Sequence, residues 1–271
     1  MGLEVGGANL TWNSTTWTNY DWSKGGDEWS KPWGGTHSMW YHYLLPRIAR
    51  FVPADSILEI APGFGRCTQF LLGLTNKLVA VDLNERCIEA CRDRFAGAEH
   101  LELHANDGST LPMVADGSIS FAFSWDSLVH AAHAPMQSYV HELARVLKPG
   151  GAAFLHHSNF AECGTSWPLE PGQRPPGNRG IDMSAGAMRQ DCLDAGLWCV
   201  TQELVPQARK GVFNDCQTLI VKPPADRAGE DAPDTNVIQR DDYAAEMSVI
   251  RMIAAAYTLE SDASGEPSRG N

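Results

Sequence analysis

Residues 56–66 read S-I-L-E-I-A-P-G-F-G-R, and this stretch decides the fold. Three apolar residues around Glu59 predict a buried strand, and the G-F-G at 63–65 predicts a tight turn at its end. Residues 67–74 can continue as a helix. A strand, a glycine turn and a helix in this order are typical of an α/β fold that binds a nucleotide-like ligand beside the turn.

A second apolar strand is predicted over residues 77–81, and it ends in Asp82. Asp82 follows Gly63 at close to the roughly 20-residue spacing at which such folds place a carboxylate on a ribose hydroxyl. The turn and the acid together predict a ligand that contains a nucleoside. A dinucleotide fingerprint needs a third glycine, and Thr68 stands at that position, so the sequence disfavours NAD.

The acid in the first strand and the glycine turn resemble the first motif of class I S-adenosylmethionine (SAM) dependent methyltransferases, an acid followed by G-x-G-x-G. Ala61 stands at the family's first glycine, and Pro62 follows it. The resemblance implies SAM as the cofactor. It assigns the methionine part to Glu59 and the turn at 61–65, and the ribose hydroxyls to Asp82.

Later segments add to the resemblance. Asp107 matches the aspartate that accepts the adenine amino group in the family, although N-D-G at 106–108 is also typical of a simple turn. The backbone near Ser124 would hold the ammonium group. Residues 145–151, R-V-L-K-P-G-G, are similar to the family's segment between a helix and the fifth strand. The predicted cofactor-binding residues are Glu59, Ala61, Pro62, Gly63, Gly65, Asp82, Leu83, Asn106, Asp107, Gly108, Ser124 and Trp125.

The resemblance covers roughly residues 55–222 and implies an α/β fold. We expect a Rossmann-like, doubly wound sheet of seven strands, mostly parallel with an antiparallel last strand, and helices on both faces. Residues 46–222 would form the methyltransferase domain. Residues 1–45 would form an aromatic-rich strap or lid, and residues 223–271 an acidic linker, a C-terminal helix and a tail disordered from Glu260 onward.

Candidate catalytic residues follow the fourth predicted strand, residues 118–123. Asp126 and His130 would lie one turn apart on one face of a helix, where a carboxylate can raise the basicity of an imidazole and fix its tautomer. This resembles the Asp-x-x-x-His arrangement of some small-molecule methyltransferases, which implies His130 as the base and Asp126 as its partner. His133 is the nearest competitor. His157, after the fifth predicted strand, is predicted to be a second polar contact for the substrate.

Metal dependence is disfavoured by the residues after the fifth strand. Metal-dependent O-methyltransferases place carboxylates or an amide after strands four and five, and Asp126 matches the first position. Residues 156–159, H-H-S-N, lack the expected acid, and hard cations prefer oxygen ligands. We therefore predict that no metal is bound.

The N-terminal segment is rich in aromatic residues, with six of the nine tryptophans within residues 1–45. Up to Thr36 it shows no sustained period, so irregular structure is predicted, followed by a helix over 39–51 with Ser38 as its cap. So many aromatic rings need a surface on which to pack. The segment would be a strap over the sheet or a lid whose indoles stack on a flat substrate, and both descriptions can hold together.

Two further segments lie outside the motifs. Residues 160–181 form a long loop rich in proline and glycine, and such loops are usually functional or disordered. We expect this loop to set acceptor specificity, and its candidate contacts are Trp167, Arg174 and Arg179. Residues 243–257 can form one amphipathic helix that packs on the domain or on a second subunit.

Composition limits the class of partner. The formal charge of −12 disfavours nucleic acid, because phosphate binding needs a basic surface. Seven scattered cysteines without a C-x-x-C pair predict reduced, mostly buried thiols and a cytoplasmic protein. No apolar run approaches the roughly 18 residues of a membrane span, and no signal peptide is recognised. A homodimer through the N- or C-terminal segment is possible.

These patterns imply transfer of a methyl group from SAM to a small-molecule acceptor, with a hydroxyl of a natural product or sugar as the expected target. Methylation of nitrogen or carbon would use the same cofactor residues, and the sequence does not separate these reactions. A NAD-dependent oxidoreductase and a SAM-binding protein without catalysis are the alternatives from other classes.

Overall fold

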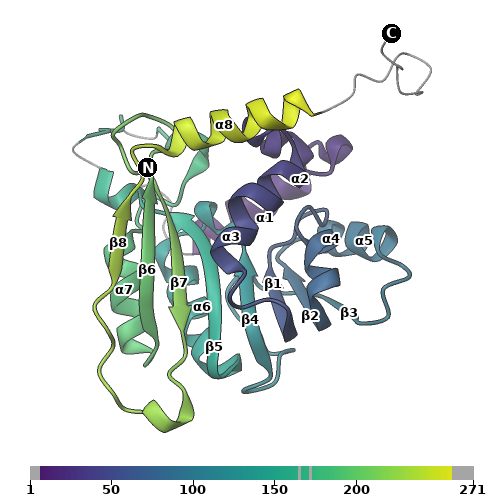
Figure 1. Ribbon diagram of the computed structural model, residues 1–271, viewed down its shortest axis with the longest axis vertical. Helices are drawn as coiled ribbons and strands as arrows, with labels where there is room; N and C mark the ends of the chain where they lie inside the picture. Colours follow the sequence, from purple (N-terminus) through teal and green to yellow (C-terminus); the bar gives the residue numbers. More distant parts are fainter. Residues whose placement is uncertain (1–6, 164–165, 171–172, 258–271) are drawn as a thin grey trace.

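The computed structural model describes residues 7–163, 166–170 and 173–257, and an eight-stranded sheet forms its centre (Figure 1). The strand order is β3-β2-β1-β4-β5-β7-β6-β8. The strands are β1 (Ala54–Ile60), β2 (Thr75–Asp82), β3 (Leu101–Ala105), β4 (Ile119–Ser124), β5 (Leu147–Ser158), β6 (Trp198–Val205), β7 (Asp215–Val221) and β8 (Asn236–Gln239). Only β7 runs antiparallel to its neighbours, β5 and β6. The predicted Rossmann-like sheet with an antiparallel last strand is confirmed.

Strand β8 is an addition to the seven predicted strands. It lies within the segment interpreted from sequence as an acidic linker, and it pairs in parallel with β6 from Thr201 opposite Asn236 onward. Four residues, N-V-I-Q, are too few to show a period of two against their acidic surroundings. The pairing with β6 therefore stabilises a strand that the local sequence does not predict.

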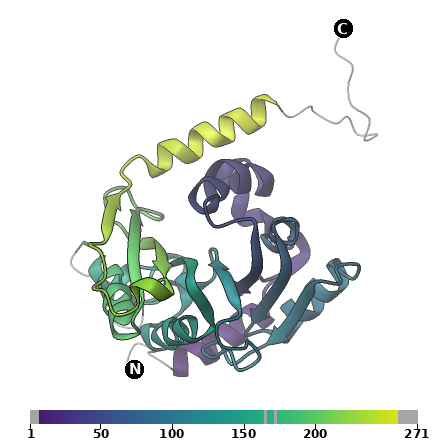
Figure 2. The same cartoon turned by 60° about the horizontal axis from the view of Figure 1, so that its bottom comes forward.

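Two hydrophobic layers cover the sheet, because successive strand side chains point to opposite faces. Ile57 of β1 faces one layer, and Leu58 faces the other. The layer at Leu58 contains α6 (His133–Val146) and α7 (Ala185–Asp194). The layer at Ile57 contains α3 (Leu45–Ile48), α4 (Thr68–Leu71) and α8 (Tyr243–Ala256), and α5 (Glu85–Arg94) packs beside β2 and β3. Figure 2 shows helices on both faces of the twisted sheet.

The N-terminal segment is largely helical, which corrects the prediction of irregular structure. It forms α1 (Gly7–Thr18), the 3₁₀ helices η1 (Trp22–Lys24) and η2 (Asp27–Trp33), α2 (Thr36–Met39) and a π-helical turn (Trp40–Leu44) that leads into α3. The helix predicted over 39–51 thus begins at Thr36 and ends at Ile48. Residues 7–18 read G-A-N-L-T-W-N-S-T-T-W-T and have no apolar stripe. Their helix depends on contacts with the rest of the domain, which local sequence does not reveal.

Two asparagines attach α1 to the loop that follows β4. The side-chain amides of Asn9 and Asn13 both donate to the carbonyl oxygen of His130, each at 3.1 Å. The side-chain oxygen of Asn9, Oδ1, accepts a hydrogen bond from the N–H of Ala132 at 2.9 Å. Both asparagines are buried, and α2 and α3 belong to the opposite layer of the core. The N-terminal segment therefore crosses the carboxyl-terminal edge of the sheet from one layer to the other.

The C-terminal helix α8 packs on the domain, one of the two arrangements expected for it. Tyr243 and Ile250 are buried in the same layer as α3. A Cβ atom added to Gly34, which follows η2, would lie 2.7 Å from the Cβ of Ala254, so the helix contacts this backbone closely. In Figure 1 α8 lies across the top of the molecule, beyond the carboxyl ends of the parallel strands. The tail predicted to be disordered from Glu260 onward lies outside the described residues.

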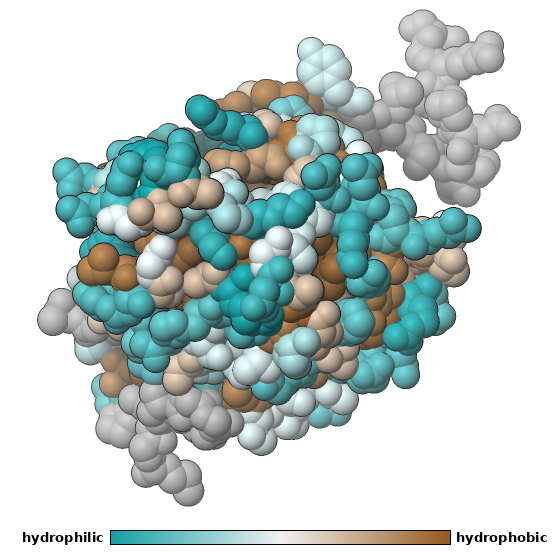
Figure 3. Space-filling view, turned by 90° about the horizontal axis from the view of Figure 1, so that it is seen from below, coloured by the Kyte–Doolittle hydropathy of each residue, from teal (hydrophilic) through white to brown (hydrophobic). Residues whose placement is uncertain are grey.

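The state of the cysteines and the polarity of the surface agree with what the composition predicts. All seven cysteines are free and buried, as predicted. In the part of the chain that the structure describes, no helix is both long and apolar enough to cross a membrane. Viewed from below, hydrophilic residues cover much of the surface and the apolar ones are interspersed among them (Figure 3).

We predict that Asn9→Ala loosens α1. The substitution removes three buried hydrogen bonds, with His130, Asn13 and Ala132, and leaves the Ala132 N–H without its acceptor. The free energy of unfolding should therefore fall by about 1–3 kcal/mol. Asn19→Ala is the matched control, because Asn19 is exposed and bonds only the nearby Thr15 carbonyl; its effect should stay within about 0.5 kcal/mol. Denaturant unfolding and amide hydrogen exchange measure both. Unchanged exchange in α1 of Asn9→Ala would contradict this description of its docking.

Candidate functional site

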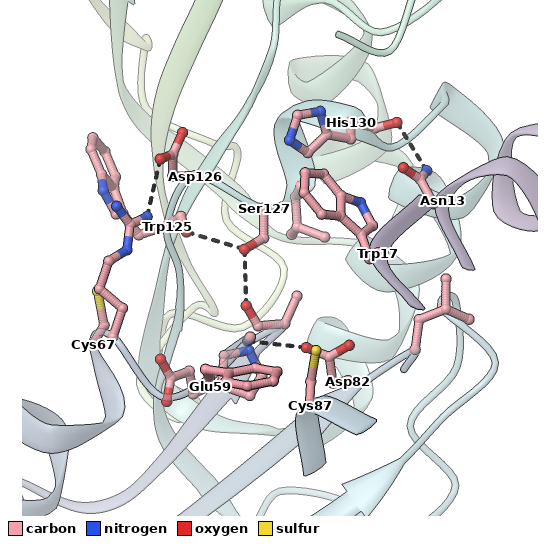
Figure 4. A pocket seen from close by; sticks show the side chains of 18 of the residues that line it. Asn13, Trp17, Glu59, Cys67, Asp82, Cys87, Trp125, Asp126, Ser127 and His130 are labelled. Atoms are coloured by element: carbon pink, nitrogen blue, oxygen red, sulfur yellow. Dashed lines mark hydrogen bonds and ion pairs between the residues drawn. The ribbon is translucent and has the colours of Figure 1, made fainter. Parts of the chain in front are cut away.

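A deep pocket lies at the carboxyl-terminal edge of the sheet, where β1, β2 and β4 end (Figure 4). About 910 Å³ of space without protein atoms lies between its walls, and part of this space is open to solvent. The predicted site residues that line it are Glu59, Ala61, Pro62, Gly63, Asp82, Leu83, Gly108, Trp125, Asp126 and His130. Six residues of the N-terminal segment also line the pocket: Leu10, Asn13, Trp17, Trp22, Gly25 and Trp29. The sheet edge and the aromatic segment therefore form one enclosure.

The glycine turn has the backbone shape that the sequence predicts. Gly63 and Gly65 have φ values of +58° and +83°, which glycine adopts without strain. Gly65 does not line the pocket. A Cβ atom there would lie 2.5 Å from the Phe95 ring, so this glycine allows close helix packing rather than a ligand contact. Ala61, at the family's first glycine, also has a positive φ of 60°, and its N–H donates to the Val81 carbonyl at 2.7 Å.

Asp82 connects the glycine turn to β2. Its carboxylate accepts the N–H of Gly63 at 3.1 Å and the N–H of Asn84 at 2.8 Å. Burial raises the pKa of Asp82 to about 6, although both hydrogen bonds favour the ionised form. The carboxyl is thus held in place before any ligand arrives.

Glu59 is buried at the floor of the pocket. It accepts a hydrogen bond from the Thr68 hydroxyl at 2.6 Å, and burial raises its pKa to about 7. Thr68 is the residue at the third-glycine position of a dinucleotide fingerprint. Its hydroxyl holds the strand acid in this fold, so the departure from the dinucleotide pattern has a structural function.

Asp107 is not among the residues that line the pocket, although the adjacent Gly108 is, and the contact of Asp107 with adenine stays a prediction. Its carboxylate accepts four hydrogen bonds from the backbone and hydroxyls of Ser109 and Thr110, at 2.7–3.1 Å. Burial raises the pKa of Asp107, but the four hydrogen bonds together outweigh it and hold the pKa below its usual value. These local hydrogen bonds are those of a turn, which is the alternative given for N-D-G at 106–108. Gly108 lines the pocket instead, and a Cβ atom there would lie 2.8 Å from Leu10 Cδ2.

Two more predicted cofactor residues, Asn106 and Ser124, lie outside the lining and bond residues near it. The Asn106 amide donates to the Tyr139 hydroxyl at 2.9 Å, and Tyr139 lines the pocket. Ser124 is fully buried, and its hydroxyl donates to the Ile60 carbonyl at 2.8 Å. Neither Asn106 nor Ser124 is among the lining residues.

Asp126 and His130 both line the pocket, but they do not form the predicted pair. Residues 128–130 form a 3₁₀ turn rather than an α-helix, and Asp126 has a φ of +59°, so the two side chains diverge (Figure 4). The Asp126 carboxylate instead accepts a 3.0 Å hydrogen bond from the Arg66 guanidinium. This ion pair is a feature that the sequence interpretation missed.

His130 has a different partner. Its Nδ1 lies 3.1 Å from the carbonyl oxygen of Asn178. Because a carbonyl can only accept, Nδ1 carries the proton in the neutral ring and Nε2 keeps its lone pair. Burial lowers the pKa of His130 to about 4. The Trp17 ring lies 4.9 Å away, centroid to centroid.

His157 is a core residue, which corrects its prediction as a substrate contact. Strand β5 extends to Ser158, so His157 pairs within the sheet instead of lying beyond its edge. The ring is fully buried, with Nε2 2.7 Å from the Thr218 hydroxyl, and burial lowers its pKa to about 4. The competitor His133 contacts Asp191 at 3.0 Å and does not line the pocket either.

The three candidate contacts of the 160–181 loop are engaged within the protein. Arg179 forms two hydrogen bonds with the Asp215 carboxylate, at 2.7 and 2.9 Å, and is nearly buried. The Arg174 guanidinium lies 4.0 Å from the Trp12 ring centroid. Trp167 lies near Arg209, at 5.9 Å.

The aromatic part of the lining was expected only as a segment, without assigned residues. Trp22 stacks on Phe64 of the glycine turn, with 4.5 Å between centroids and 3° between planes. Trp17, Trp22 and Trp29 contact one another at 5.4–6.3 Å. The density of tryptophan was the only sequence signal for this arrangement. The segment acts both as a strap, through Trp33 and α3 in the core, and as a cover over the pocket.

The described residues contain no group of three or more His, Cys, Asp or Glu side chains arranged to hold a metal ion. The polar groups of the pocket are two acids at the strand ends, an Asp–Arg pair and one histidine. Such a set can bind a ligand with hydroxyl and cationic groups and can accept a proton.

Known proteins match the central part of the chain. Residues 57–151 match the family model described as a methyltransferase domain. A probable ribosomal RNA small subunit methyltransferase A from Methanosarcina mazei is 32% identical over 139 residues, which are 44% of this chain and 49% of that protein. A ubiquinone/menaquinone biosynthesis C-methyltransferase from Ectopseudomonas mendocina is 27% identical over 126 residues, 44% of this chain and 47% of that one.

The chain spans about half the length of these curated relatives. A SAM-dependent methyltransferase from Aquifex aeolicus has a similar fold, with a TM-score of 0.51 over 75% of this chain and all of that one, at 15% identity. The strand order, the glycine turn and the family match agree with one another. Residues 57–151 therefore match a methyltransferase domain, and the fold around them is that of SAM-dependent methyltransferases.

Proposed function

We propose that this protein transfers a methyl group from SAM to a hydroxyl oxygen of a small-molecule acceptor. The observation that carries the proposal is the enclosure of Glu59, Asp82 and the free Nε2 of His130 in one pocket under the tryptophan cover. The family implies SAM as the cofactor. The geometry supports the proposal, because two acids that a cofactor could contact and a nitrogen that could accept a proton line the same pocket.

The chemistry of the pocket lining supports SAM as the ligand. Asp82 would accept the ribose hydroxyls, and the buried acid Glu59 would favour the positively charged methionine part. Leu10 and Leu83 pack against Gly108 in the pocket wall and would offer an apolar surface to the adenine. When bound, SAM supplies a methyl group that is activated by its attachment to a sulfonium.

The protein's own part in the reaction is alignment and proton acceptance. The acceptor oxygen bonds to the methyl carbon as the carbon–sulfur bond breaks, which leaves S-adenosylhomocysteine, and the hydroxyl proton passes to Nε2 of His130. A base with a pKa of about 4 is weak, so the proton leaves as the oxygen acquires positive charge. Alignment should supply most of the acceleration, and the base about 10²–10⁴-fold.

The alternatives differ in what they require of the pocket. N- and C-methylation would use the same cofactor residues, and identification of the product separates them. NAD binding is disfavoured because the Thr68 side chain, bonded to Glu59, occupies the third-glycine position. A ribosomal RNA acceptor, as named for the Methanosarcina relative, is disfavoured by the charge of −12. A binding protein without catalysis would bind SAM but show no turnover.

We predict that the protein binds S-adenosylhomocysteine and that Asp82→Asn abolishes or strongly weakens binding. The affinity should fall as the pH is lowered through 7 and then 6, because Glu59 and Asp82 hold protons at those pH values in the free protein and a bound ligand favours their ionised forms. The fall should approach about tenfold per pH unit for each group below its pKa. Calorimetric titration at several pH values measures this.

The control ligand is NADH, titrated in parallel. Binding of NADH without binding of S-adenosylhomocysteine would overturn the assignment of the cofactor. An Asp82→Asn variant with wild-type affinity for S-adenosylhomocysteine would remove Asp82 from the site.

We predict that His130→Gln lowers kcat by about 10²–10⁴-fold, with little change in affinity for S-adenosylhomocysteine. Because the pKa of the base is low, wild-type kcat should stay level from pH 8 down to 5 and fall only as the pH approaches about 4, where Nε2 is protonated. Methyl transfer to an acceptor found by screening hydroxylated compounds measures both. His133→Gln is the matched control, since His133 lies outside the pocket. Full turnover by His130→Gln would refute its role as the base.

A further inference from the structure

Trp125, which lines the pocket, also belongs to a cluster of buried side chains from five separate segments. We call it the Trp125 cluster; its members are Trp33, Tyr43, Trp125, His156, Gln217 and Tyr243. The Trp125 ring stacks on His156 at 4.4 Å and lies 5.5 Å from Tyr43 and 6.1 Å from Trp33. Tyr243 of α8 lies within 6.3 Å of Trp33 and Tyr43. No member is more than 4% exposed.

The cluster concentrates polar atoms that have no hydrogen-bond partner. Six of the ten such buried side-chain atoms among the described residues lie here. They are Nε1 of Trp33, Nε1 of Trp125, Nδ1 and Nε2 of His156, Oε1 of Gln217 and the Tyr243 hydroxyl. His156 Nε2 lies 3.2 Å from an oxygen of Asp215, so Nδ1 is the atom of that ring left for a further partner. Buried polar atoms are normally paired, so their accumulation at one place indicates a binding function.

The charged groups near the cluster are already paired. Arg179 bonds Asp215, and Arg66 bonds Asp126. The unpaired atoms belong to two indole N–H groups, an imidazole nitrogen, an amide oxygen and a phenol, and none belongs to a carboxylate, an ammonium or a guanidinium group. A ligand that matches them is uncharged and carries several groups that can both donate and accept.

We propose that the Trp125 cluster is the acceptor subsite and that the acceptor is a neutral sugar. This rests on the proposed methyl-transfer function. A pyranose ring carries several hydroxyl groups, each a donor and an acceptor, whereas a simple phenol would satisfy only one or two of the five side chains. A sugar in the subsite could place its C–H surface against the indoles of Trp33 and Trp125 only if these packed rings separate, since Trp125 is stacked on His156.

The position of the cluster agrees with this assignment. Trp125 follows β4 and His156 lies near the end of β5, and ligands of open α/β sheets bind at the carboxyl ends of the strands. Trp125 is shared by the cofactor pocket and the cluster, so an acceptor held there lies next to the cofactor. Because the cluster is buried beneath α8 and η2, acceptor entry requires one of them to move.

Saturation-transfer NMR of the full chain tests the proposal, with and without saturating S-adenosylhomocysteine. The probes are a set of neutral methyl glycosides (gluco, galacto, manno, rhamno, fuco and xylo) at millimolar concentration, with catechol as the phenolic comparator. We expect at least one glycoside to bind. Tyr243→Phe and Trp33→Phe, which each remove one unpaired group and keep a ring, should weaken it by about tenfold or more.

Tyr257→Phe is the matched control, because Tyr257 follows the same helix and is 87% exposed. All three variants should keep wild-type affinity for S-adenosylhomocysteine, which shows that they are folded. Binding of none of the glycosides, or of catechol alone, overturns the proposal. A Tyr243→Phe variant with a raised Tm and unchanged glycoside binding also overturns the proposal. The wild-type Tyr243 hydroxyl would then contribute nothing to sugar binding. Failure to bind S-adenosylhomocysteine while a glycoside still binds would reject the proposed function and leave the sugar subsite standing.

Discussion

The hydrogen bond from the Gly63 N–H to the buried Asp82 carboxylate is the constraint on which the pocket depends. It ties the turn after β1 to the end of the neighbouring strand, so two strand ends become one rigid rim. The same burial raises the pKa of Asp82 to about 6, so the group that fixes the rim is also sensitive to the charge of a ligand. Glu59 is likewise a buried acid with a raised pKa, and a hydrogen bond from the Thr68 hydroxyl holds it in place.

The parts of the fold that the sequence predicts are those with a strong local period or turn signal. The apolar runs of β1 and β2 lie where expected, because strands covered on both faces of a sheet need continuous apolar sequence. The glycines of the turn also lie where expected, because few other residues adopt their positive φ values. Helix α1 could not be predicted, since its stability comes from Asn9 and Asn13 contacts with a loop more than 100 residues away. Strand β8 depends in the same way on its partner β6.

The candidate site shows the same division at the level of single side chains. Glu59, Asp82 and His130 line the pocket because each lies near the carboxyl end of a strand, and their contacts with a ligand stay predictions. The Asp126–His130 pair was wrong because a positive φ at Asp126 and a 3₁₀ turn replace the helix that the spacing assumed. His157 was wrong because β5 runs a few residues further than its apolar run. Sequence spacing gives position along the chain, but the direction of a side chain depends on backbone angles.

One chain segment covers both the cofactor pocket and the Trp125 cluster. Trp29 faces the pocket and Trp33 the cluster, and both belong to η2, a single rigid 3₁₀ run. A movement of η2 that uncovers one site therefore also disturbs the other. Kinetically, the two substrates should not exchange independently: steady-state patterns should show an obligatory order of addition, and release of the methylated product should be coupled to release of S-adenosylhomocysteine.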